Sequence, residues 1–186
     1  MFKIYELLNK YSSGKNVLIL FMFTQVVYGI MLGFSIPNVM QYSSGMKILD
    51  LIPTGYSPEY VQKLFKTLGE AGRGVYLYQQ IPLDMIYPGL FAVSYTLLLV
   101  FFFKKAFSKE SKFKKLWMLP IFAGLFDYLE NIGIIIMLRM YPVFQVWIAQ
   151  TTNAFSVLKS ILSMLTFILI LLGVIVFLVK RFTDRT

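Results

Sequence analysis

Four long apolar runs stand out along the chain, separated by segments that are rich in polar residues. They cover residues 16–36, 83–103, 116–138 and 157–179, and each holds 21 to 23 residues. A helix of about 20 residues rises about 30 Å, which is the thickness of the hydrocarbon core of a bilayer. The pattern therefore predicts an all-α polytopic membrane protein with four transmembrane helices, which together form a single domain over residues 1–186.

A shorter amphipathic pattern lies in the segment between the first two runs, residues 37–82. Ser57 is a typical N-cap residue, and Pro58 suits the first turn of a helix. Apolar positions then recur with helical spacing at Val61, Leu64, Phe65 and Leu68. Gly69 follows as a stop signal. We expect a short amphipathic helix at 58–68 that either lies on the outer membrane surface or caps the bundle.

The basic residues indicate how the chain is oriented. Twelve of the 18 lysine and arginine residues precede the first run, lie between the second and third, or follow the fourth. Cytoplasmic segments of membrane proteins carry such an excess. We therefore predict a multi-pass protein of the cell membrane with cytoplasmic N- and C-termini, and with residues 37–82 and 139–156 outside.

Composition narrows the chemistry. Hydrophobic residues make up 58% of the chain, which is more than soluble domains of this size contain. The sequence has no cysteine and no histidine, so disulfides, cysteine or histidine metal sites and thiolate nucleophiles are excluded. The net charge of +9 comes from basic residues that flank the apolar runs and indicate topology, so we expect no nucleic-acid partner. We also expect no metal and no cofactor.

The third apolar run contains two carboxylates, Asp127 and Glu130, followed by Asn131. Spacings of three and four place these side chains on one helix face. Counting about 1.5 Å per residue from Leu116 puts the two carboxylates roughly 16 and 21 Å above the inner edge of the membrane. Ionisable groups at that depth are costly and usually functional. We interpret Asp127 and Glu130 as a candidate acid/base pair, which Lys159 is long enough to reach.

Polar residues on the other runs fall at a similar depth. We expect them to form a ligand-binding site with the carboxylates; the candidates are Asn131, Lys159, Arg73, Asp84, Tyr87, Tyr28 and Gln25. Arg73 is expected to fold over the mouth of this site. Pro88 and Pro120 predict kinks in the second and third helices, and Gly124 permits close approach. A widened cavity in the outer half of the bundle would result.

Several of these residues carry a resemblance to other membrane proteins. The residues are Leu68-Gly69, Gly72-Arg73, Tyr76, Asp84, Tyr87-Pro88, Asp127, Glu130-Asn131 and Lys159, and the pattern resembles uncharacterised four-helix membrane proteins. In length and topology the chain is similar to the sterol-isomerase-like and sigma-2-receptor-like family, whose members bind sterols or lipids with intramembrane carboxylates. The histidine that the isomerases of that family use is absent from this sequence.

The leading functional hypothesis is a carboxylate-containing pocket in the outer half of the bilayer that binds or processes a lipid-like amphiphile. One alternative is a membrane subunit or assembly scaffold, in which the same polar groups only join helices and dock a membrane protein partner. A second alternative is a proton- or cation-coupled transport component that works as a homo-oligomer, because four helices without an inverted repeat make a poor transporter alone.

Overall fold

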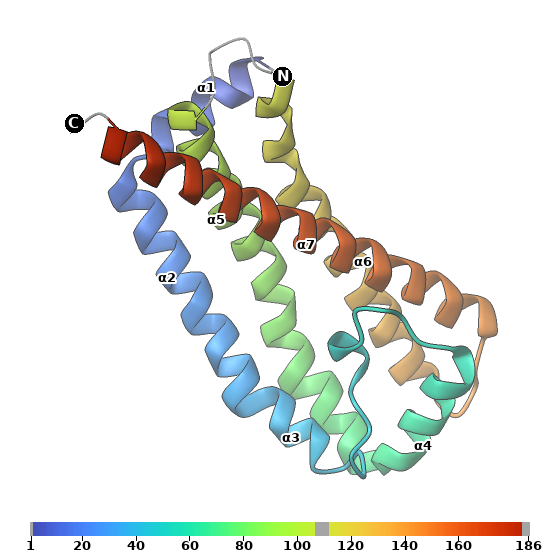
Figure 1. Ribbon diagram of the computed structural model, residues 1–186. Coiled ribbons are helices and arrows are strands. Elements are labelled where there is room, and N and C mark those ends of the chain that lie inside the picture. The colour runs from blue at the N-terminus through green and yellow to red at the C-terminus, as the bar shows by residue number, and fades with distance from the viewer. Residues whose placement is uncertain (1, 107–111, 184–186) are drawn as a thin grey trace.

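The protein is built from helices, as a computed structural model of residues 2–106 and 112–183 shows (Figure 1). The helices and helical turns run in the following order: α1 (Phe2–Tyr11), α2 (Gly14–Ile30), η1 (Met31–Ser35), α3 (Ile36–Met40), η2 (Leu49–Leu51), α4 (Pro58–Val75), η3 (Tyr76–Gln80), α5 (Ile81–Ala106), η4 (Lys112–Met118), α6 (Leu119–Met140) and α7 (Val146–Thr183). The described ranges contain no strand. The predicted all-α class is confirmed.

Within the described residues, four helical runs are long and apolar enough to cross a membrane. They are Gly14–Met40, Pro58–Lys105, Lys115–Met140 and Val146–Lys180, and each includes one of the predicted apolar runs. Their outward faces carry large apolar side chains, for example Leu18, Met22 and Val26 on α2 and Leu171, Ile175 and Leu178 on α7. Such faces suit contact with lipid chains.

The helices are longer than the apolar runs predicted. The helix α7 begins at Val146 rather than at residue 157, so the predicted outer segment 139–156 is mostly helical. Its first turns are amphipathic rather than apolar, with a buried stripe at Ile148, Ala149, Thr152 and Ser156. A search for continuous apolarity misses such turns, whereas helical periodicity includes them.

The predicted amphipathic helix forms, and its regular turns end at Gly69 as expected. Ser57 caps α4 by accepting a 3.2 Å hydrogen bond from the backbone N–H of Tyr60. Gly69 takes φ 63° and ψ −173°, which is not helical backbone, so α4 consists of two helical segments joined by a kink at this residue. The second segment was not expected, and it continues through η3 into α5. The apolar face is almost wholly buried, at Val61, Leu64, Phe65 and Leu68. Of the two predicted placements, the structure shows the one in which the helix caps the bundle.

The centre of the bundle is formed by α5 and α6, with α2 against α5 and α7 against both (Figure 1). Gly124 of α6 lies so close to α5 that an added Cβ would come within 2.7 Å of the carbonyl oxygen of Pro88. The predicted kink at Pro120 is wrong, because α6 begins at Leu119 and this proline sits in its first turn. The α1 helix and the end of α7 lie at one end of the bundle, and α3 and α4 lie at the other, called the α4 end below.

Candidate functional site

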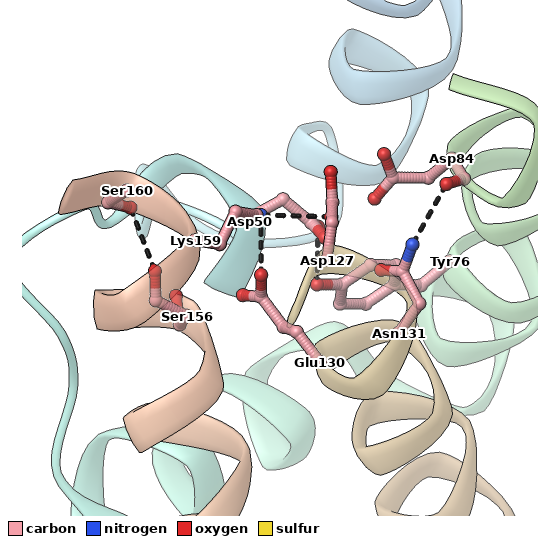
Figure 2. Close-up of polar contacts among 9 residues, drawn as sticks. All are labelled: Asp50, Tyr76, Asp84, Asp127, Glu130, Asn131, Ser156, Lys159 and Ser160. Carbon is pink, nitrogen blue, oxygen red and sulfur yellow. Dashed lines mark hydrogen bonds and ion pairs between the residues drawn. The ribbon is translucent and has the colours of Figure 1, made fainter. Parts of the chain in front are cut away.

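The polar residues of α6 and α7 meet inside the bundle near the α4 end (Figure 2). The ammonium of Lys159 lies 3.2 Å from Oδ1 of Asp127 and also pairs with the carboxylate of Glu130. The Glu130 side chain is fully buried, and that of Asp127 is 9% exposed. The predicted reach of Lys159 to Glu130 is confirmed, and one cation bridges two carboxylates that lie one turn apart on α6.

Asn131 and Asp84 connect the neighbouring helices α6 and α5. Nδ2 of Asn131 donates a 2.9 Å hydrogen bond to the backbone carbonyl of Asp84. The carboxylate of Asp84 therefore stays free of this bond, and in Figure 2 it points from α5 toward Asp127. Among the described residues, no N–H or hydroxyl donor reaches Oδ2 of Asp84, although the residue is only 4% exposed, and the carboxyl group of Asp50 lies within hydrogen-bond reach of the Asp84 side chain.

A further carboxylate, Asp50, joins the cluster from outside the predicted helices. It lies in the short turn η2, and its Oδ2 accepts a 2.6 Å hydrogen bond from the hydroxyl of Tyr76. Asn153 of α7 holds the same loop in place by accepting a 2.7 Å bond from the backbone N–H of Tyr56. Sequence reasoning missed Asp50, although a lone aspartate inside the apolar stretch Ile48-Leu49-Asp50-Leu51-Ile52 was a usable signal.

Tyr56 shows how strongly this loop is buried. The residue is 8% exposed, and its hydroxyl has no hydrogen-bond partner among the described residues. Burial raises the pKa of the Tyr56 phenol well above its ordinary value, and the nearby carboxylates of Glu130 and Asp50 add to the effect. An ionised phenolate would be poorly solvated and would face negative charge, so Tyr56 contributes a neutral hydroxyl.

Two π-helical turns face each other beside the cluster. They are η1 in the first spanning run and η3 in the second, and the hydroxyl of Ser35 donates a 2.5 Å hydrogen bond to Oε1 of Gln80 between them. Single π-turns inside α-helices are frequent at functional sites. The Nε2 group of Gln80 has no partner among the described residues, although Gln80 is fully buried.

These groups border a cavity of about 340 Å³ between α2, α5, α6, α7 and the η2 loop. Three carboxylates line it, from Asp50, Asp84 and Asp127, together with the ammonium of Lys159. Aromatic rings form another part of the wall: Tyr28, Tyr87, Phe91 and Phe167. Glu130 and Asn131 do not line the cavity but support the residues that do.

Two predicted site residues lie elsewhere. Nη1 of Arg73 donates a 2.8 Å bond to the carbonyl of Phe65, and its guanidinium stacks 3.8 Å from the ring centroid of Tyr141. Arg73 lies on the second segment of α4 and reaches back across the kink at Gly69 to Phe65, so its guanidinium does not fold over the cavity. Nε2 of Gln25 donates a 3.0 Å bond to the hydroxyl of Tyr95 instead of reaching the cluster.

The remaining predicted residues come together as expected in space. Tyr28 of α2 and Tyr87 of α5 stack with ring centroids 5.3 Å apart, and both line the cavity with Asp84, Asp127 and Lys159. Their catalytic and ligand-binding roles stay predictions. The geometry shows buried, unevenly charged polar groups beside an empty space, which is an arrangement that bonding between helices alone does not require.

Comparison with protein-family models, with curated proteins and with solved structures finds no match to this chain. The fold and the site by themselves therefore define its class, an all-α polytopic membrane protein with a carboxylate-lined cavity inside the helical bundle.

Proposed function

We propose that the protein binds a lipid-like amphiphile in the cavity between α2, α5, α6 and α7. The observation that carries this proposal is that one cavity has both a charged and an apolar lining. Carboxylates and Lys159 line one part, whereas Phe91, Met164 and Phe167 line another. A molecule with a polar headgroup and an apolar chain matches both parts, because its headgroup can contact the charged lining while its chain contacts the apolar lining.

The size and position of the cavity support this ligand class. A volume of about 340 Å³ falls at the lower end of small-molecule pockets, about 300–1,000 Å³. Met164 and Phe167 line the cavity and are also 64% and 48% exposed on the apolar outer face of α7. A headgroup and its first carbons fit inside, and the rest of the chain continues along α7 into the lipid.

The charge pattern of the sequence supports an outward-facing position for the site. Twelve of 18 basic residues flank the spanning runs on the side that the N-terminus shares, so we place the α4 end toward the outer leaflet. Of the proposed acid/base pair, Asp127 would meet the ligand, because it lines the cavity. Glu130 would act through Lys159, which pairs with both carboxylates.

Native mass spectrometry of protein extracted from its own membranes tests the proposal. The wild-type chain is expected to leave its micelle with a bound lipid-like molecule. Ser163→Phe should abolish that retention, because Ser163 lines the cavity and the ring fills it. Ile161→Phe is the matched control, since Ile161 lies on the same helix and is 50% exposed on the apolar surface. Equal retention by both variants, or none by the wild type, would contradict the proposal.

A second candidate function has its own observation. Lys159 pairs with both carboxylates of α6, which is also what polar groups that only join helices would do. In that case the protein is a membrane subunit or scaffold, and the cavity is incidental. The two hypotheses differ in what Ser163→Phe does to cells that depend on this protein. The scaffold hypothesis predicts that the variant replaces the wild type in such cells, whereas the binding hypothesis predicts that it does not.

A further inference from the structure

The charges around the cavity do not balance. Four carboxyl groups gather there, from Asp50, Asp84, Asp127 and Glu130, and within the described residues Lys159 forms ion pairs only with Asp127 and Glu130. Arg73, which was expected to fold over the mouth of the site, contacts Phe65 and Tyr141 instead and brings no positive charge to the cavity. Buried carboxylates are costly unless a cation or hydrogen-bond donors compensate them. The cavity is therefore lined by two carboxyl groups, those of Asp50 and Asp84, that form no ion pair with a described cation.

Two acceptor oxygens without an N–H or hydroxyl donor belong to residues that line the cavity, although the atoms themselves are buried. Within the described part of the chain, Oδ2 of Asp84 and Oδ1 of Asp50 receive no N–H or hydroxyl donor, and both residues line the cavity. The two carboxyl groups lie within hydrogen-bond reach of each other, which requires a proton or a cation between them. Oδ1 of Asp127, by contrast, already accepts a hydrogen bond from the ammonium of Lys159. Two acceptor oxygens beside one space call for a group with several N–H donors and a positive charge, which is the description of a primary ammonium.

A third group, independent of the carboxylates, also lacks its partner. Gln80 is fully buried and lines the cavity, its Oε1 accepts from Ser35, and its Nε2 donates to no described atom. Gln80 and Asp84 are four residues apart on one continuous helical run, so the two side chains lie on the same face. A ligand that satisfies both must present an oxygen acceptor close to its ammonium.

The aromatic part of the wall suits the same ligand. Tyr28 and Tyr87 stack beside Asp84, and Phe91 lies 6.0 Å from the Tyr87 ring, centroid to centroid. Faces of aromatic rings attract cations, and the effect is larger where water is excluded. An anionic headgroup would gain nothing from these rings and would meet three carboxylates.

We infer that the cavity takes the headgroup of a long-chain primary amine that carries a neighbouring oxygen, such as a vicinal amino alcohol. The inference rests on the proposed function and adds the headgroup class to it. The ammonium donates to Asp84 and Asp50, the ligand oxygen accepts from Gln80, and the alkyl chain runs past Phe167 along α7. Uncharged or anionic amphiphiles of the same chain length are poorer ligands.

Binding is measured with the full chain in phosphatidylcholine nanodiscs, with empty nanodiscs as the blank for partitioning. The probes share a twelve-carbon chain: a vicinal amino alcohol, dodecylamine, dodecanol and dodecanoate. We expect the amino alcohol to bind best, dodecylamine next, and the other two weakly. Asp84→Asn and Asp50→Asn should each lower amine affinity about tenfold or more, because each removes a charge-assisted hydrogen bond. Glu70→Gln, at an exposed carboxylate on α4, is the control and should change nothing.

The outcomes separate the inference from the function on which it rests. If dodecanol or dodecanoate binds as tightly as the amines and Ser163→Phe abolishes binding, the protein binds amphiphiles but the headgroup inference is wrong. If Ser163→Phe changes the binding of no probe, both proposals fail. The thermal stability of Asp84→Asn and Asp50→Asn is also measured without ligand, and both variants should unfold at a temperature at least as high as the wild type. Amine binding that survives in these folded variants would overturn the inference.

Discussion

At the scale of single residues, Lys159 holds the polar cluster together. Its ammonium pairs with Asp127 and Glu130, and the side chains of all three residues are less than one-fifth exposed. Loss of either carboxylate leaves the lysine with the other partner. Loss of the lysine leaves two buried carboxylates one turn apart with no cation between them, which is the more costly change.

Lys159→Met should therefore destabilise the protein strongly, by about 3–5 kcal/mol, as measured by thermal unfolding in detergent. Glu130→Gln should be nearly neutral, because Lys159 keeps Asp127. The triple variant Asp127→Asn, Glu130→Gln, Lys159→Met should recover most of the loss, since it removes every charge of the triad. Lys66→Met, at an exposed position on α4, serves as the control for loss of a lysine. A Lys159→Met protein that melts at the wild-type temperature would show that the pairs add no stability.

The sequence was informative where an ionisable residue interrupts an apolar run, because the cost of burial singles such residues out. Asp127, Glu130 and Lys159 were recognised in this way, and the structure brings them into contact. Asp50 was missed because its place beside the cavity depends on how a loop folds back. The position expected for Arg73 was wrong for the same reason, since the bend at Gly69 directs its side chain to Phe65.

At the scale of elements, α4 belongs to the core of the bundle. Leu64 and Phe65 are fully buried and share a hydrophobic cluster with residues of α2, α6 and α7. A helix bound only to the membrane surface would keep its apolar face outside the protein. The cluster instead makes α4 a structural support for the loop that carries Asp50.

Leu64→Ala should lower the free energy of unfolding by about 2–5 kcal/mol, because it opens a cavity in a packed site. Lys63→Ala, one residue earlier on the exposed face of the same helix, should change stability by less than about 0.5 kcal/mol. Thermal unfolding in detergent compares the two variants. If α4 were dispensable to the bundle, Leu64→Ala would melt with the wild type.

The existence of the four spanning helices followed from the length of the apolar runs, whereas their full extent did not. The first turns of α7 are amphipathic, and α3 and η3 extend the first two spanning helices into residues 37–82, which the sequence predicts as an outer segment. These turns are stabilised by contacts between segments far apart in sequence, such as Ser35 with Gln80. Local patterns carry no signal for such pairings.

At the scale of the whole molecule, the spanning runs and the basic residues together make a testable topology. The α1 helix and the end of α7 lie at the same end of the bundle, as an even number of crossings requires (Figure 1). The excess of lysine and arginine predicts that this end is cytoplasmic. The cavity would then face the outer leaflet, where an amphiphile could enter from outside the cell.

Single cysteines test this orientation, because the native chain has none to interfere. Cysteines at Ser44 and Gln145, both exposed at the α4 end, should react with a membrane-impermeant thiol reagent in intact cells. A cysteine at Asn9, exposed on α1, should react only after the cells are opened. None of the three changes alters a charge. Labelling of Asn9→Cys in intact cells, with protection of the other two, would reverse the orientation.

An experimental structure of the protein in a lipid nanodisc, at a resolution that shows side chains, would decide whether the cavity is a binding site. Binding predicts elongated density between α2, α5 and α7, with its compact end beside Asp84 and Asp50 and its chain along Phe167. The opposite result would be a closed space in which side chains fill the volume and Asp84 is compensated by protein groups alone. That result would contradict an amphiphile site and leave the polar cluster as a means of joining helices.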